Sequence, residues 1–223
     1  MEKNLLDLKN ISVTFKTRRG IFKAVEDLCL SLKEGEILGL VGESGAGKSI
    51  TGAAILGLIP SSGYVSSGEI FFNGQRIDKN PKSVRGSKIS MIFQDPLVSL
   101  NPLRRIGDQL IETIQTHSPC SRTEAFARAT NSLKEVGIDP SRFNAYPHTF
   151  SGGMRQRVVI ALALAPGPAI IIADEPTTSL DVSNQAQILN LLKDLCKEKK
   201  TSVILITHDM GVISQTTDRV AVL

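Results

Sequence analysis

The chain contains a phosphate-loop pattern, G-x-x-x-x-G-K-[ST], which here reads Gly42-Glu43-Ser44-Gly45-Ala46-Gly47-Lys48-Ser49. A short and almost wholly apolar run, residues 36–41, precedes the loop and suits a buried strand of a parallel sheet. Residues 48–59 follow it, and their richness in Ala, Leu and Ile suits a helix. Because strand, loop and helix come in this order, the sequence predicts an α/β fold built around a phosphate-binding turn.

Each part of this loop has an expected role in holding a nucleotide. Glycines allow positive φ and let backbone N–H groups close around phosphate oxygens, and the following helix points its N-terminus at the same anion. Lys48 is expected to reach the β- and γ-phosphates of ATP, and Ser49 to ligate Mg²⁺. On the motif alone, the alternative is a glycine-rich turn with an exposed lysine. The predicted nucleotide-binding residues of this stretch are Gly42, Glu43, Ser44, Gly45, Ala46, Gly47, Lys48, Ser49 and Ile50.

A pair of carboxylates follows a second apolar run, residues 169–173, and precedes Pro176. Because proline ends the strand, Asp174 and Glu175 are expected at its carboxyl end, where open α/β sheets bind ligands. Neighbours on a strand point to opposite sides. We therefore assign Asp174 to the metal shell and Glu175 to the general base or water positioner. The alternative is a solvated acidic pair at a strand end.

Two further stretches have the residues of a phosphate contact. Ser151-Gly152-Gly153 precedes the apolar run 158–165, which predicts an N-capped helix start with open backbone donors. One chain needs one phosphate loop per nucleotide, so this second cradle is expected to serve the ATP of another molecule. His208 follows a strand-like run, residues 202–207, and is expected near the γ-phosphate. The alternatives are an ordinary N-cap and a surface histidine.

Taken in order, these motifs resemble those of the ATP-binding cassette (ABC) ATPase family, and the likeness covers essentially all 223 residues. The resemblance implies that Ser151 to Gln156 form the signature loop and that Ser179-Leu180-Asp181 form the D-loop. It also implies that Gln94 is the Q-loop residue, which acts in catalysis and ligates Mg²⁺. His208 is then the catalytic switch histidine. Phe15 falls where the family places an aromatic ring that stacks on adenine.

Two stretches are similar to the peptide and nickel importer branch of this family. They are residues 93–102, which read Phe-Gln-Asp-Pro-Leu-Val-Ser-Leu-Asn-Pro, and residues 146–150, which read Tyr-Pro-His-Thr-Phe. Phe150 stands where that branch usually has Leu, and Ser179 where it often has Ala. Phe22 lies close enough in sequence to Phe15 to be a rival for the adenine contact.

The resemblance implies an α/β fold with a P-loop NTPase (RecA-like) core, an N-terminal antiparallel β subdomain and an inserted α-helical subdomain. The residues agree with this reading, because residues 5–32 are strand-like and residues 103–136 are helical and polar. We expect residues 1–223 to form one ABC ATPase domain. Its nucleotide-binding core would comprise residues 1–94 and 158–223, and its helical subdomain with the signature loop residues 95–157.

Composition bounds the class of protein. A hydrophobic content of 41% and a charged content of 22% are ordinary for a globular protein, and a net charge of +4 does not require a nucleic-acid partner. No apolar run approaches the roughly 20 residues of a membrane span, and the first residues do not open a signal peptide. The chain stops inside an apolar strand, residues 219–223, so we expect a C-terminal truncation relative to the family.

The three cysteines, Cys29, Cys120 and Cys196, are far apart and show no C-x-x-C spacing. Neither a disulfide framework nor a zinc site is indicated, which fits a reducing cytosol. Cys29 and Cys196 stand at apolar positions and are expected in the core.

The resemblance implies that this chain is the ATPase subunit of a bacterial importer for peptides or related small solutes, with nickel as one option. Expected partners are a second ABC ATPase subunit, the same or a sister chain, the permease subunits, and indirectly a solute-binding protein. No nucleic acid is expected, and the predicted location is the cytoplasmic face of the inner membrane. The segment after Gln94, residues 95–105, is the expected docking surface. The alternatives are a soluble ABC ATPase acting on nucleic acid or the ribosome, and a nucleotide-gated module with little hydrolysis.

Overall fold

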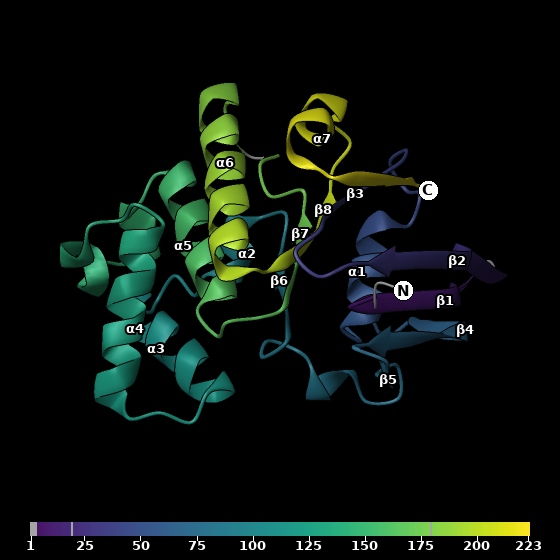
Figure 1. Ribbon diagram of the computed structural model, residues 1–223, viewed down its shortest axis with the longest axis horizontal. Coiled ribbons are helices and arrows are strands. Elements are labelled where there is room, and N and C mark those ends of the chain that lie inside the picture. The colour runs from purple at the N-terminus through teal and green to yellow at the C-terminus, as the bar shows by residue number, and fades with distance from the viewer. Residues whose placement is uncertain (1–3, 19, 179) are drawn as a thin grey trace. The chain divides into compact units, whose positions relative to one another are not determined.

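The computed structural model describes residues 4–18, 20–178 and 180–223, and it contains both strands and helices (Figure 1). The chain divides into two compact units. The first comprises Met1–Arg85 with Ser202–Leu223, and the second comprises Gly86–Thr201. The subdomain boundaries expected from the sequence stay a prediction.

The first unit contains an antiparallel sheet with strand order β2-β1-β4-β5. Its strands are β1 (Leu6–Thr17), β2 (Gly20–Leu32), β4 (Gly63–Phe72) and β5 (Gln75–Arg76). β1 buries Leu6 and Leu8, and then Ile11 and Val13, with a shift of register between Leu8 and Ile11. At that shift Asn10 adopts a left-handed conformation with φ 51°. The irregularity keeps both apolar pairs on the core side although an even alternation would not.

The same unit contains three parallel strands, in which β3 (Ile37–Val41) pairs with both β8 (Ser202–Ile206) and β9 (Arg219–Val222). Every residue of β8 is buried, which explains why all of its residues after Ser202 are apolar. α1 (Lys48–Ile55) follows β3, and α7 (Met210–Thr216) connects β8 to β9. α7 packs closely on β3, because a Cβ at Gly39 would lie 2.6 Å from Ile213.

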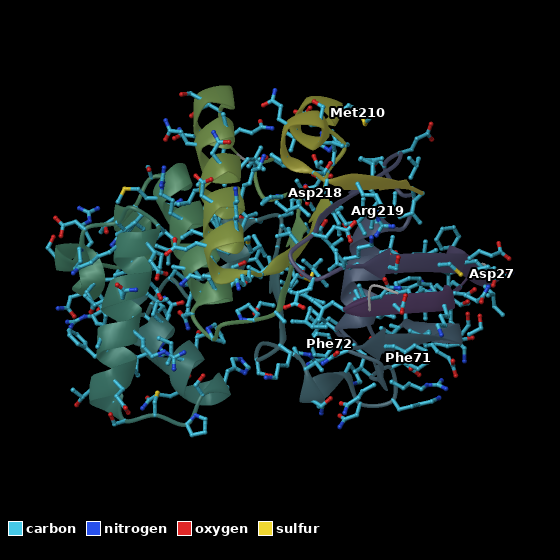
Figure 2. All side chains as sticks on the ribbon, viewed as in Figure 1. Asp27, Phe71, Phe72, Met210, Asp218 and Arg219 are labelled. Carbon is cyan, nitrogen blue, oxygen red and sulfur yellow. The ribbon has the colours of Figure 1, made fainter. Side chains whose placement is uncertain are left out.

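Polar contacts hold β9 beside β3 at the point where α7 leads into β9. Figure 2 labels Asp218 and Arg219, the two residues at this point. Asp218 accepts a hydrogen bond of 2.8 Å from the backbone N–H of Ile37. The Arg219 Nε donates to Oε1 of the buried Glu36 at 2.6 Å. Burial raises the pKa of the Glu36 carboxyl, but the hydrogen bonds from Arg219 and from the Lys33 backbone outweigh it and hold this pKa below its usual range.

The second unit contains the parallel pair β6 (Ile89–Ile92) and β7 (Ile170–Asp174), together with five α-helices among its described residues. The helices are α2 (Pro96–Ser99), α3 (Ile106–His117), α4 (Arg122–Glu135), α5 (Gly152–Leu164) and α6 (Val182–Lys199). α3 and α4 pack side by side, as Figure 1 shows in teal. α4 begins with a capping box between Ser121 and Glu124, and α6 begins at the N-cap Asp181.

One prediction about the core is confirmed and one is wrong. Cys196 is buried, and burial raises the pKa of its thiol to about 12. Cys29 is exposed on β2, where its Sγ accepts a hydrogen bond of 3.3 Å from the backbone N–H of Asn10. The alternation of the strand explains the difference, because Leu30 and Leu32 point into the core and Cys29 points away from it.

Candidate nucleotide-binding site

The phosphate-loop residues 42–49 connect β3 to α1, and Ile50 lies in the first turn of that helix. Gly45 and Gly47 take left-handed conformations, with φ 88° and 90°. Gly47 is the N-cap of α1 and has no side chain with which to cap it, so the first backbone N–H groups of the helix are left to an anion. The loop therefore has the conformation that a phosphate cradle requires.

Close backbone contacts explain why glycine is needed at two of these positions. A Cβ at Gly47 would lie 2.4 Å from the carbonyl oxygen of Ala24, and a Cβ at Gly42 would lie 2.6 Å from that of Leu223. Both distances are far below van der Waals contact, and neither backbone oxygen can move without moving its strand. The loop is thus held against β2 and the end of β9.

Lys48 is folded back into the loop. Its Nζ donates hydrogen bonds to the carbonyl oxygens of Gly42, at 2.9 Å, and Glu43, at 2.8 Å, and the residue is only 6% exposed. Because these acceptors are the loop's own backbone, the ammonium group is held at the inside of the turn. The alternative of an exposed lysine on a glycine-rich turn is wrong for this chain.

Phe15 and His208 lie in the same unit as the loop. Phe15, on β1, is half-buried. Its ring lies close to β4, as shown by the 2.6 Å that would separate it from a Cβ added at Gly63. His208 is exposed just beyond the end of β8. Since β8 and β3 are adjacent and parallel, His208 emerges at the edge of the sheet from which the phosphate loop emerges.

The two candidate carboxylates lie in the second unit and differ in environment. Asp174 is the last residue of β7 and is 7% exposed. Glu175 lies outside the strand in a left-handed conformation with φ 45°, which is uncommon for a residue with a side chain. The strand alternation from which we predicted opposite directions therefore ends at Asp174, and a turn sets the direction of Glu175.

The carboxylate of Glu175 accepts hydrogen bonds from two segments of the chain that are far apart in sequence. The side-chain amide of Gln94, which follows β6, donates to Oε2 of Glu175 at 3.0 Å. The hydroxyl of Thr178 donates to the same oxygen at 2.8 Å. The structure thus brings together Gln94 and Glu175, and it adds Thr178, which the sequence analysis missed. The sequence feature that could have identified Thr178 is a hydroxyl three residues after Glu175, across a turn.

The signature loop begins α5, and its Ser151 is the N-cap, accepting from the backbone N–H of Met154 at 3.4 Å. Ser151 and Gly152 are exposed. A Cβ at Gly153 would lie 3.3 Å from Oδ1 of Asn184, so the start of α5 packs closely on the start of α6. Of the expected D-loop, Leu180 and Asp181 are described and Ser179 lies outside the described residues.

The candidate metal ligands offer oxygen donors of the kind that Mg²⁺ prefers. Asp174 supplies a carboxylate and Gln94 an amide oxygen, since the amide nitrogen is engaged with Glu175. Ser49 supplies a hydroxyl in the first turn of α1. Among the described residues, no three side chains of the types His, Cys, Asp and Glu gather as metal ligands.

Comparison with known proteins assigns the family. Residues 25–178 match the family described as ABC transporter. The chain belongs to this family. It is 50% identical to the oligopeptide transport ATP-binding protein OppD of Bacillus subtilis, over 98% of this chain and 63% of that protein. It is 49% identical to the dipeptide transport ATP-binding protein DppD of the same organism, over 100% of this chain and 68% of that protein.

Solved ABC cassettes share the fold. A dimeric, post-hydrolysis structure of the ATP-binding cassette MJ0796 bound to ADP and Pi superposes with a TM-score of 0.84 at 32% identity, covering 98% of this chain and 94% of that one. CbiO1 of Clostridium perfringens, part of the ABC transporter complex cbiONQ, also gives 0.84, at 29% identity over 99% and 85% of the two chains. The predicted fold class is confirmed.

This ABC transporter chain covers only part of its relatives. It spans 63% of the length of the Bacillus subtilis OppD and 66% of that of the Escherichia coli OppD, to which it is 48% identical. In the part of the chain that the structure describes, no helix has both the length and the apolar character needed to cross a membrane.

Proposed function

We propose that this chain is the ATP-hydrolysing nucleotide-binding subunit of an ABC importer, which couples ATP binding and hydrolysis to the uptake of peptides or related small solutes. The observation that carries the proposal is the phosphate loop with Lys48 held inside it by the carbonyls of Gly42 and Glu43. The solute class follows from relatives of 48–50% identity that are named oligopeptide and dipeptide transport ATP-binding proteins.

Each residue of the site has its own role in ATP hydrolysis. The phosphate loop and Lys48 bind the β- and γ-phosphates, and Phe15 stacks on adenine. Glu175 accepts a proton from the attacking water, while Gln94 and His208 contact the reacting groups. Ser49, Gln94 and Asp174 hold Mg²⁺, which when bound neutralises negative charge on the phosphate oxygens.

The signature loop acts on the nucleotide of a second subunit. Ser151, Gly152 and Gly153 present the N-terminus of α5, a helix of 13 residues, at an exposed position. Such an end binds anions through its first backbone N–H groups and its dipole. A second cassette, identical or a sister chain, would place its ATP there, and the similar cassette MJ0796 is described as dimeric.

A permease would dock on the segment that follows Gln94. Leu97, Val98 and Leu103 are 57%, 80% and 85% exposed there, which is unusual for side chains of this size. A shallow groove of about 580 Å³ lies in the same segment and is bounded by α3 and α5. Exposed apolar side chains around a groove favour a protein partner over nucleic acid, so we place the subunit at the cytoplasmic face of the inner membrane. A solute-binding protein would then act through the permease.

ATP turnover with Mg²⁺ tests the enzymatic part of this proposal. Glu175→Gln removes the base and keeps the shape, so we expect the rate to fall by roughly 10²–10⁴-fold. Glu198→Gln, the same exchange at an exposed position on α6, is the matched control and should keep the full rate. Absence of Mg²⁺-dependent turnover in the unchanged chain, or equal rates in both variants, would contradict the assignment.

Capture from native membranes tests the transport part. Val98→Lys, the exchange of an exposed apolar side chain for a charged one, should abolish recovery of permease subunits identified by mass spectrometry. Val220→Lys, on the exposed face of β9, is the control and should leave recovery unchanged. Recovery of ribosomal proteins or DNA in place of membrane proteins would favour the soluble class of ABC ATPase.

A further inference from the structure

Thr178, which no motif predicted, contacts the proposed general base directly. Its hydroxyl donates to Oε2 of Glu175 at 2.8 Å, and its backbone N–H donates to the carbonyl oxygen of Glu175 at 3.3 Å. These two contacts close a turn from Glu175 to Thr178. The turn brings the hydroxyl back onto the carboxylate of the residue that opens it.

The backbone of Glu175 explains why such a support is needed. The residue is in a left-handed conformation that a side chain rarely adopts, and such strain persists only where the surroundings hold it. The long side chain also rotates about several bonds, whereas proton transfer requires one orientation toward the attacking water. Two hydrogen bonds to one carboxylate oxygen restrict this rotation.

The two donors to Oε2 differ in how they are attached. Gln94 opens the segment of residues 95–105, which we propose as the permease-docking surface, so its amide moves when that segment moves. Thr178 belongs to the same turn as Glu175 and stays with it. The hydroxyl therefore keeps the carboxylate oriented in states in which the amide of Gln94 has withdrawn.

We propose that Thr178 is a positioning residue that holds the Glu175 carboxylate in the orientation required for hydrolysis. The proposal rests on the proposed function of Glu175 as the base. In the step concerned, the water oxygen bonds to the γ-phosphorus while the bond from that phosphorus to the β–γ bridging oxygen breaks. Glu175 accepts the water proton, and the bridging oxygen leaves with its electron pair as part of ADP. Thr178 does not touch the reacting atoms.

The decisive comparison is between Thr178→Val and Thr178→Ser. Valine has the shape of threonine without the donor, and serine keeps the donor without the methyl group. We expect Thr178→Val to lower kcat roughly tenfold to a hundredfold, as loss of orientation does, with little change in the KM for ATP. Thr178→Ser should recover most of the rate. Thr130→Val is the matched control, because it removes a hydroxyl on α4 that donates to the backbone carbonyl oxygen of Phe126 at 2.8 Å.

A structural readout makes the test independent of turnover. In a crystal structure of Thr178→Val, the Glu175 side chain should leave its position or spread over several rotamers, and in Thr178→Ser it should stay. An unmoved Glu175 in the valine variant, or equal loss of kcat in the valine and serine variants, would overturn the proposal. If the unchanged chain and Glu175→Gln hydrolyse ATP at the same rate, the proposed role of Glu175 as the base is wrong. The rotamer of Glu175 in the Thr178→Val structure then still tests separately whether Thr178 fixes the orientation of this side chain.

Discussion

Phe15 on β1 and Phe22 on β2 are direct partners across the antiparallel sheet, yet only one of them is packed. Phe15 is half-buried, with its ring against the backbone of Gly63 on β4. Phe22 is 56% exposed. A ring that is fixed on one side loses little freedom when adenine stacks on the other, so the structure favours Phe15 over its rival as the adenine contact.

Exchange of each ring for alanine separates the two. Stacking of a base on an aromatic ring contributes about 1–3 kcal/mol, so Phe15→Ala should weaken ATP binding roughly tenfold or more and nearly keep turnover at saturation. Phe22→Ala, its matched control, should leave the affinity unchanged. Titration with a fluorescent ATP analogue measures both. A loss of melting temperature without a loss of affinity in Phe15→Ala would make this residue plain core.

Lys48→Ala should remove most of the ATP affinity and essentially all hydrolysis. Lys48 is the cation that the loop carbonyls of Gly42 and Glu43 hold in place, and we propose that its charge neutralises the β- and γ-phosphates. Lys23→Ala, which removes an exposed lysine paired with Glu26, controls for the loss of one positive charge. The same titration and a turnover assay provide the readout, and unchanged affinity with unchanged turnover would remove Lys48 from the site.

Much of the fold could be predicted because its central strands are buried on both faces. β3, β7 and β8 appear in the sequence as continuous apolar runs, and their ends were expected within one or two residues of where they lie. The boundaries of β4 and α1 were wrong. The residues before the Asn73-Gly74 turn predict a strand at residues 68–72, whereas β4 begins at Gly63, because pairing with the long β1 imposes the extended conformation. α1 ends at Ile55, since Gly57 turns left-handed with φ 61°.

The parts of the site that the sequence could not provide depend on contacts between distant segments. Motifs identify Gln94 and Glu175, but the hydrogen bond between these residues joins positions that are 81 residues apart. Likewise, no local pattern marks Glu36 as buried beside Arg219, which lies 183 residues further on. Local spacing predicts which side chains carry chemistry, and the tertiary fold decides which of them hold one another.

The Glu36 and Arg219 pair predicts how stability changes with pH. The pKa of Glu36 is lowered by folding, so its contribution is present in full above its unfolded pKa of about 4.3 and is lost as the pH falls through the lower folded value. Glu36→Gln should reduce the free energy of unfolding by about 1–3 kcal/mol at pH 7. It should also flatten the decline of stability below roughly pH 4. Urea unfolding of the unchanged chain and of Glu36→Gln, at pH 7 and at values down to below roughly pH 4, measures the difference in the free energy of unfolding.

Glu34→Gln is the matched control for that series, because Glu34 is exposed in the turn before β3. Its stability should follow that of the unchanged chain at every pH. If Glu36→Gln loses no stability at neutral pH, or declines in acid as steeply as the unchanged chain, then the hydrogen bonds from Arg219 and Lys33 do not favour the ionised carboxylate.

The last prediction concerns the signature loop. Glu175→Gln should bind ATP without hydrolysing it, so a closed pair of chains should accumulate and elute as a dimer from a sizing column. Ser151 is exposed at the N-cap of α5 and is proposed to face the partner's γ-phosphate. Ser151→Arg, added to the same chain, should block closure because the larger side chain fills the anion site, while the chain's own phosphate loop stays intact.

We therefore expect the double variant to bind ATP as a monomer. Ser141→Arg, the same exchange at an exposed serine outside the loop, controls for added bulk and charge and should leave the Glu175→Gln dimer in place. Circular dichroism must show the same folded signal in all three proteins. A double variant that still dimerises with ATP, or a folded monomer that no longer binds it, would mean that the signature loop does not act across the interface between two chains.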